Sequence, residues 1–290
     1  MACPLCNEKK YIKLSEEPVE DIVARYNNMY KINTAKYFTT EKLELRQCVN
    51  CRMEYYPNGQ EGDAEFYAAF SNFDGYYVKD KYEYKWLLRK ICEINPQSIL
   101  EIGCGRGYFL DHLKDSFEVR ATEHNPAAIQ VLNEKGIKLD EEGKTYDLIC
   151  SFQVMEHVKD LGEFLNWIMG KLNPQGYFFC AVPNPDSTLI KDVFQPIDMP
   201  PHHMNHIHEE TLYKLSELFN MEVVDYFAEP LTINSGLQNV LKEREKAYAH
   251  GLWKGILNKF ARGIRMALFP VMLETIPLTG HSHGILLKKR

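Results

Sequence analysis

Three glycines at alternate positions follow a short apolar segment that carries a single carboxylate. The segment is Ser98–Ile102, in which Glu101 is the only charged residue, and the glycines are Gly103, Gly105 and Gly107. Glycine permits a tight turn and lets a ligand lie against bare backbone. Ligands of open parallel sheets bind beyond the carboxyl ends of the strands. We therefore expect this loop to hold a small ligand.

The residues around the loop narrow the chemistry of that ligand. A dinucleotide fingerprint requires its third glycine at position 108, where Tyr108 stands instead. The sequence also contains neither a P-loop nor a Gly-x-Ser-x-Gly elbow. Glu123 ends a second predicted strand, where a carboxylate can accept hydrogen bonds from ribose hydroxyls. His124 could then lie against an adenine ring, so the pattern favours a nucleoside ligand without a pyrophosphate.

Four of the eight cysteines form two Cys-x-x-Cys pairs near the N-terminus, Cys3 with Cys6 and Cys48 with Cys51. Two residues between cysteines let both thiolates point at one ion, and four thiolates close a tetrahedral site. We therefore expect a structural Zn²⁺, in preference to a redox pair or two unrelated pairs. The other four cysteines stand in apolar segments and are expected to be small core residues; they are Cys92, Cys104, Cys150 and Cys180.

Alternating strands and helices must position these residues. The predicted strands are Ser98–Ile102, Glu118–Thr122, Gly136–Leu139, Asp147–Phe152, Tyr177–Val182, Glu222–Phe227 and Gly284–Leu287. The predicted helices are Tyr82–Glu93, Tyr108–Lys114, Ala127–Lys135, Leu161–Leu172 and Glu209–Phe219, with a turn at Asn173–Gly176. This alternation indicates a mostly parallel α/β sheet covered on both faces. We expect a zinc-binding module at 1–57, an aromatic connector and helix at 58–95, and a domain at 96–290 with a helical insertion at 236–276.

Residues 98–182 resemble class I S-adenosylmethionine-dependent methyltransferases. The resemblance rests on Leu-Glu-Ile-Gly-Cys-Gly-Arg-Gly at 100–107, on Glu123, and on Tyr-Asp-Leu-Ile-Cys-Ser-Phe-Gln-Val-Met-Glu-His-Val at 146–158. It implies a Rossmann-like sheet whose last strand is antiparallel. It also implies that Glu101 orders the amino end of the cofactor, that the glycines flank its methionine part, that Glu123 holds the ribose, and that Gln153 lines the pocket.

The arrangement of the whole chain adds a second resemblance. A four-cysteine ribbon, a Tyr-rich connector that includes Tyr76-Tyr77, and this domain together resemble bacterial methyltransferases that modify sugars. The resemblance covers most of residues 1–228. It implies that the acceptor is a sugar or a nucleotide-linked sugar in polysaccharide or natural-product biosynthesis.

Transfer to an oxygen or carbon acceptor needs a base, and histidine suits that task near neutral pH. His157 follows the strand at 147–152, and His203 lies in a His-rich loop before the helix at 209–219. These two are the candidate bases, and His208 is expected to cap that helix. Magnesium prefers oxygen ligands, and no cluster of carboxylates lies beside these histidines in the sequence, so a base without a metal is favoured.

Composition limits the partners. The chain has 290 residues, of which 45% are apolar, and a net charge of −6, which argues against nucleic acid. We expect a cytoplasmic protein, because no secretory signal or apolar run of membrane-spanning length occurs. The basic amphipathic stretch 252–269 is expected to cap the acceptor site, with membrane-surface contact as the minor alternative. The sequence does not indicate an oligomeric state.

Two other functions remain open. One is an RNA methyltransferase whose zinc module holds the substrate, although no Asn/Asp-Pro-Pro-Tyr segment follows the strand at 147–152. The other is a non-catalytic zinc-ribbon interaction protein, against which the intact glycine loop and Glu123 argue.

Overall fold

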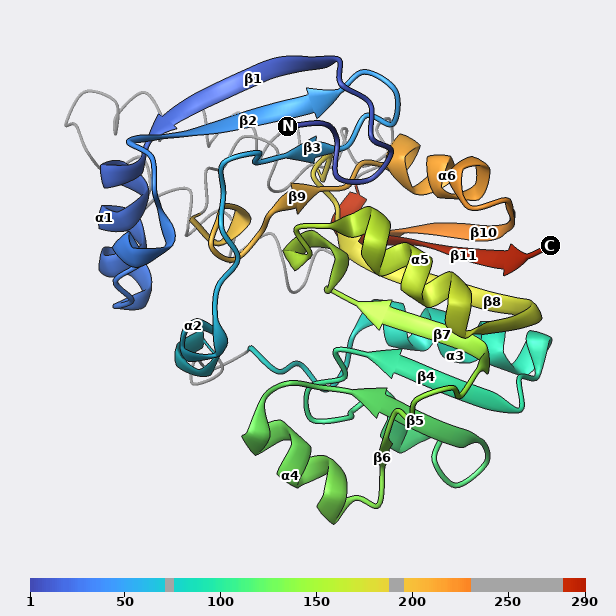
Figure 1. Cartoon of the computed structure of the whole chain (residues 1–290). Coiled ribbons are helices and arrows are strands. Elements are labelled where there is room, and N and C mark those ends of the chain that lie inside the picture. The colour runs from blue at the N-terminus through green and yellow to red at the C-terminus, as the bar shows by residue number, and fades with distance from the viewer. Residues whose placement is uncertain (71–75, 188–195, 231–278) are drawn as a thin grey trace, which may run out of the picture.

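The computed structural model describes residues 1–70, 76–187, 196–230 and 279–290, which form two sheets (Figure 1). In order across the larger sheet, its strands are β10 (Met221–Pro230), β11 (Thr279–Lys289), β8 (Leu172–Pro183), β7 (Tyr146–Phe152), β4 (Ser98–Ile102), β5 (Glu118–Thr122) and β6 (Lys138–Leu139). Strands β8, β7, β4, β5 and β6 are parallel to one another, and β11 is antiparallel to both β8 and β10. The predicted Rossmann-like sheet with an antiparallel last strand is confirmed.

Consecutive residues of β4 face opposite layers, which explains why its interior positions are apolar apart from Glu101. Leu100 packs in a core with side chains of α5 (Leu161–Lys171) and α6 (Glu209–Leu218). Ile99 packs in a second core with side chains of α3 (Tyr82–Ile94) and α4 (Pro126–Glu134). A central strand buried on both sides is typical of a parallel sheet covered by helices.

Two expectations about local structure are wrong. Residues 108–114 form only the 3₁₀ turn η2 (Leu110–His112), because Gly107 at φ +68° precedes them and the chain already turns toward β5 at Ser116. The Asn173–Gly176 segment lies within β8 as a bulge. Tyr146 pairs with Leu172 but Leu148 with Tyr177, so four residues of β8 stand opposite one.

The four cysteines outside the two pairs differ in burial. Cys104, Cys150 and Cys180 are buried as expected, but Cys92 is exposed. Cys92 lies on α3, whose buried face carries Leu87 and Ile91. Position 92 therefore points away from the sheet, and helical spacing around Ile91 could have indicated this.

The smaller sheet joins the N-terminus to a distant part of the chain. Its order is β1 (Tyr11–Pro18), β2 (Lys42–Cys48), β3 (Glu54–Tyr55) and β9 (Asn205–His206), all antiparallel. The 3₁₀ turn η1 (Ala35–Tyr37) and helix α1 (Val19–Tyr30) lie between β1 and β2. The last strand comes from the His-rich loop, so the N-terminal region and this loop form one sheet.

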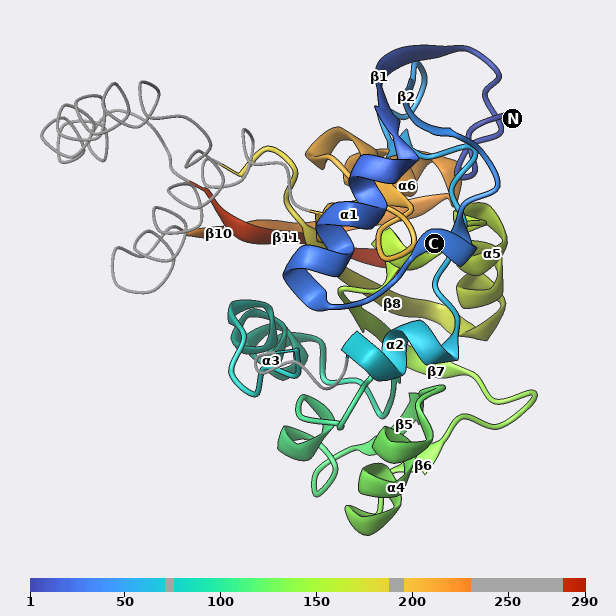
Figure 2. The same cartoon turned by 90° about the vertical axis from the view of Figure 1, so that its left-hand side faces the viewer.

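Aromatic residues of the N-terminal elements form a third core, which, in the part of the chain that the structure describes, contains no residue of the larger sheet. Helix α2 (Ala64–Phe70) buries Phe66 and Phe70 against Tyr26 of α1 and against Met199, next to the 3₁₀ turn η4 (Pro196–Asp198). Figure 2 looks onto the carboxyl ends of the parallel strands, and α1 and α2 lie in front of them. The N-terminal elements thus cover the edge at which the ligand site is expected.

Candidate active site and metal centre

The glycine loop follows β4 in a conformation that only glycine adopts freely. Gly103, Gly105 and Gly107 have φ values of +64°, +54° and +68°. A Cβ on Gly103 would lie 2.8 Å from Val154 Cγ2, just past β7, and one on Gly105 would lie 2.7 Å from Tyr77 Cε1. The bare backbone therefore lets both neighbours approach the loop closely.

Glu123 follows β5 and binds the loop through its carboxylate. Its Oε2 accepts a hydrogen bond from Gly105 N at 2.7 Å. Its Oε1 accepts from His124 N at 2.7 Å and Asn125 N at 2.8 Å. The predicted pair of glycine loop and carboxylate is thus in direct contact, whereas the imidazole of His124 is exposed.

Glu101 is almost completely buried, and no hydrogen-bond partner for its Oε2 exists among the described residues. Burial raises its pKa to about 8, with the charge of Glu123 as a further cause. A buried carboxylate of this kind is stabilised when a cationic donor lies beside it. The ammonium group of an amino-acid ligand on the neighbouring glycine loop would supply such a donor, so these residues fit the methionine part of S-adenosylmethionine.

Gln153 begins the loop after β7 in the left-handed region, at φ +59°. Its N–H donates to Ala181 O of β8 at 2.8 Å. The loop continues through Val154 to η3 (Met155–His157), so it runs from the glycine loop to His157.

Tyr77 is a residue that sequence reasoning did not assign to the site. Its ring covers Gly105, its hydroxyl accepts from Asn125 Nδ2 at 3.3 Å, and the Arg106 guanidinium lies 4.9 Å from the ring centroid. The aromatic connector was visible in the sequence, but nothing there indicated that it returns to the glycine loop.

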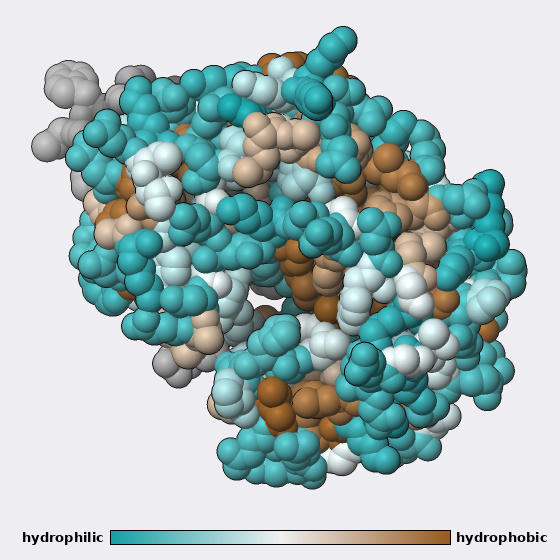
Figure 3. Space-filling model, in the orientation of Figure 1, coloured by the Kyte–Doolittle hydropathy of each residue, from teal (hydrophilic) through white to brown (hydrophobic). Residues whose placement is uncertain are grey.

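Both candidate bases lie in one cluster with a third histidine. The ring centroids of His157, His202 and His203 are 4.5 to 4.9 Å apart, and the His202 ring stacks on Phe70 of α2 at 4.8 Å. His157 comes from η3 and the other two from the loop before β9. Figure 3 shows a hollow with hydrophobic walls on the side where the arrowheads of β4 and β7 point in Figure 1.

Two carboxylates that are near these histidines in the sequence also lie near them in space, Glu156 beside His157 and Asp198 beside His203. His157 Nε2 lies 3.8 Å from Glu156 Oε1, and His203 Nδ1 lies 3.3 Å from Asp198 Oδ1. Glu156 is buried, and burial raises its pKa to about 8. Each of these carboxylates stands alone beside one histidine, so they do not form the cluster of oxygen ligands that Mg²⁺ prefers.

Burial also keeps the three imidazoles neutral. It lowers the pKa of His157 to about 4 and lowers those of His202 and His203 well below the usual range. A neutral imidazole at physiological pH has a lone pair that can accept a proton or bind a metal.

Glu54 of β3 connects the N-terminal sheet to the His-rich loop. It accepts from His206 Nδ1 at 3.1 Å and from His208 Nε2 at 2.9 Å, and the other nitrogen of His208 contacts Asp186. Burial opposes the Glu54 charge, but the two histidines outweigh it and lower the pKa to about 2. His208 occupies the expected N-cap position immediately before α6, but its side chain makes no capping hydrogen bond.

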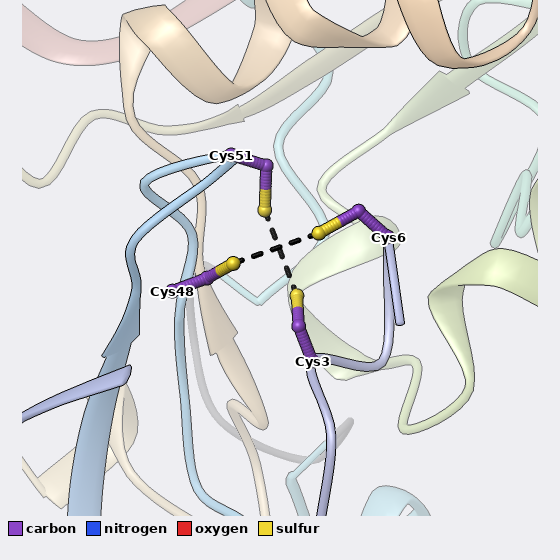
Figure 4. A group of neighbouring side chains, drawn as sticks. All are labelled: Cys3, Cys6, Cys48 and Cys51. Carbon is purple, nitrogen blue, oxygen red and sulfur yellow. Dashed lines mark hydrogen bonds between the residues drawn. The ribbon is translucent and has the colours of Figure 1, made fainter. Parts of the chain in front are cut away.

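The four N-terminal cysteines meet as predicted. Their sulfurs lie within 4.8 Å of one another, with Cys3 Sγ 3.6 Å from Cys51 Sγ and Cys6 Sγ 3.5 Å from Cys48 Sγ. Figure 4 shows all four pointing toward one centre. Thiolates at 2.3 Å from a tetrahedral ion lie about 3.8 Å apart, so the group could hold Zn²⁺.

Comparison with known protein families identifies the family of the part of the chain that forms the larger sheet. Residues 76–226, just over half of the chain, match the model of the methyltransferase domain family. The chain belongs to this family. The match begins at Tyr76 and ends at Tyr226 of β10, so it contains the glycine loop, Glu123 and His157 but neither cysteine pair.

Similarity to individual proteins is partial. A ubiquinone biosynthesis O-methyltransferase of Bartonella tribocorum is 29% identical over 30% of this chain and 41% of its own length. A probable S-adenosylmethionine-dependent methyltransferase of Mycolicibacterium smegmatis is 27% identical over 44% of this chain and 53% of its own. The chain thus spans about half or less of these relatives.

Among solved structures, a putative sarcosine dimethylglycine methyltransferase of Galdieria sulphuraria is similar over 71% of this chain and 85% of its own, at 17% identity and a TM-score of 0.48.

Some expectations fall on residues that the structure does not describe. The helical insertion at 236–276, with the amphipathic stretch 252–269, lies outside the described residues. Within the described ranges, no helix combines the length and apolar character needed to cross a membrane.

Proposed function

We propose that this protein transfers a methyl group from S-adenosylmethionine to a small-molecule acceptor. The observation that carries the proposal is the glycine loop tied to Glu123 beside the unpartnered, buried Glu101, in a chain of the methyltransferase family. Bound cofactor would supply a sulfonium methyl group as the electrophile. Glu101 would bind its ammonium, Glu123 its ribose and Gln153 the pocket wall, with His124 near the adenine.

The acceptor would enter the hollow between the sheet edge and α2, where the histidine cluster lies. We propose a sugar or nucleotide-linked sugar, which the resemblance of the whole arrangement favours. The ring of Tyr67 on α2, which is only partly buried and lies edge-on to His157, suits packing against a sugar face. The net charge of −6 disfavours RNA, whose binding needs clustered cations.

We propose that the imidazole of His157 or of His203 takes the proton of the acceptor during methyl transfer. His157 is the better placed of the two, because its side chain keeps 20% exposure while that of His203 keeps 8%. The hydrogen bond from Nδ1 of His157 to the carbonyl of His202 fixes the ring and leaves the lone pair on Nε2 as the one that would accept the proton.

We also propose that Zn²⁺ bound by Cys3, Cys6, Cys48 and Cys51 is structural. Four thiolates leave no coordination position for substrate or water. The ion would join the two ends of the N-terminal segment and so hold β3 against β9, next to the histidine cluster.

Calorimetry with S-adenosylmethionine tests the cofactor site first. Glu123→Gln is expected to weaken binding about tenfold or more, because the carboxylate loses charge-assisted bonds to the loop and the ribose. Glu142→Gln, an exposed carboxylate outside the site, is the matched control. Absence of binding by the unaltered protein would contradict the function and favour the interaction-protein alternative.

A screen with labelled cofactor then tests the acceptor class. Nucleotide sugars, phenolic quinone precursors and ribosomal RNA are offered in parallel, and incorporation into a nucleotide sugar is expected. Incorporation into RNA alone would contradict the small-molecule proposal, and incorporation into phenols alone would contradict the sugar class while preserving methyl transfer.

A further inference from the structure

The three histidines are arranged as if around a common point. Their ring centroids form a nearly equilateral triangle, with His157–His202 at 4.5 Å, His202–His203 at 4.6 Å and His157–His203 at 4.9 Å. Imidazoles bound to one ion through nitrogens at about 2.0–2.1 Å have centroids about 5 Å apart. One ring nitrogen of each histidine also lies within 4.8 Å of the other two.

The Nδ1 atom of each ring already faces an oxygen. His157 Nδ1 lies 2.7 Å from His202 O, His202 Nδ1 lies 3.0 Å from Ile197 O, and His203 Nδ1 lies 3.3 Å from Asp198 Oδ1. The first two oxygens are backbone carbonyls, which can only accept, so Nδ1 of His157 and Nδ1 of His202 carry the proton and their Nε2 atoms keep the lone pair. Histidine ligands of metals are oriented in this way by carbonyls and carboxylates behind them.

Two buried polar groups at the cluster have no partner among the described residues. His202 Nε2 is one, although its side chain is about 95% buried. The carboxylate of Glu156 is the other, since both of its oxygens are buried without a hydrogen bond, and Oε1 lies 3.8 Å from His157 Nε2. A cation among the three rings would satisfy the lone pair and balance the carboxylate charge.

We propose that His157, His202 and His203 bind one divalent ion of the zinc class, at a second metal site separate from the four thiols. Three neutral nitrogen ligands suit Zn²⁺ and similar first-row ions, whereas Mg²⁺ prefers oxygen. Three protein ligands leave a position open toward the hollow, as in catalytic rather than structural sites.

Ion binding and proton acceptance compete for the same nitrogens. An Nε2 that holds a metal cannot act as a base, so this site and the imidazole base are alternatives for one cluster. The proposed metal site depends on the proposed function in one respect only, namely that the histidine cluster lies where the acceptor would bind. Metal binding itself is measured without cofactor or acceptor, so its failure and the failure of methyl transfer are distinguishable.

Titration of the metal-free full chain with Co²⁺ separates the two sites. Cobalt bound by four thiolates shows intense sulfur-to-cobalt charge transfer, whereas cobalt bound by nitrogens shows only weaker visible bands. Two equivalents are expected, one with each signature. His202→Phe, which keeps a ring to stack on Phe70 but removes the nitrogens, is expected to weaken binding of the second equivalent at least tenfold.

The first equivalent serves as an internal measure of folding in that variant, because its charge-transfer band requires the assembled cysteines. His112→Phe, an exposed histidine on η2, is the matched control and is expected to bind two equivalents. A single equivalent in the unaltered protein, or a second equivalent that binds His202→Phe with unchanged affinity, would overturn the proposal.

Discussion

The cysteine and histidine clusters gather similar numbers of metal-binding side chains but are built in different ways. Each cysteine pair spans four residues of chain, and three of the four side chains are fully buried. The histidines come from two loops 45 residues apart, and the side chain of His157 keeps 20% of its surface exposed. This contrast agrees with our proposals that the first cluster serves stability and the second serves chemistry.

Disruption of the cysteine cluster tests the stability half of this contrast. Cys48→Ser is expected to lower the free energy of unfolding by about 5 kcal/mol, because a structural ion contributes directly to folding. Urea unfolding with zinc content measured in parallel checks this. Cys92→Ser, at the exposed cysteine of α3, should stay within about 0.5 kcal/mol of the unaltered protein. Equal effects of the two variants would argue against a metal at the four thiols.

The opposite pattern is expected at the histidines. His157→Gln should lower the rate of methyl transfer by about 10²–10³-fold, while the cofactor Kd and the unfolding midpoint change little. Because burial lowers the His157 pKa to about 4, its imidazole stays neutral above that pH, and activity should be flat through neutrality and fall only as the pH approaches 4. A large loss of stability without a selective loss of rate would show that this cluster is structural as well.

Glu54 lies between the two regions and should show the smallest effect. Its pKa is lowered from 4.5 to about 2. Its contribution to the free energy of unfolding is therefore complete above pH 4.5 and is lost as the pH falls toward 2. The pKa values of His206 and His208 are raised, since their bonds to Glu54 outweigh burial, so their contribution is complete below 6.5 and lost at higher pH.

Together these shifts predict that the contact is strongest between about pH 4.5 and 6.5. Glu54→Gln should lower the free energy of unfolding by about 2–3 kcal/mol in that window and less outside it. Glu44→Gln, whose carboxylate pairs with Arg46 on β2, is the comparison at a half-exposed site. A loss that does not change with pH would contradict the role of the two histidines.

The cofactor side of the molecule could be predicted because its signals are local. A buried strand, the glycines after it and a carboxylate at the end of the next strand fix Glu101, Gly105 and Glu123 relative to one another through the parallel register. The two Cys-x-x-Cys pairs are equally local. On this side only the prediction of a regular helix at 108–114 was wrong. Helix propensity does not show that few residues separate the glycine loop from β5.

The acceptor side could not be predicted to the same degree, because its contacts join distant segments. The packing of Tyr77 on Gly105 and the position of Glu156 beside the histidines depend on how loops return to the sheet edge. Helical or strand periodicity carries no information about such returns. The identity of the histidines was visible, but their convergence with His202 was not.

The two residues of β9 have a consequence for how the chain is made. Tyr55 pairs with Asn205, and Glu54 with His206. A ribosome must therefore add 150 further residues before the N-terminal sheet receives its last strand. Until then β3 is an unpaired edge strand of the N-terminal sheet. The N-terminal region, although synthesised first, can complete its sheet only after most of the methyltransferase domain has left the ribosome.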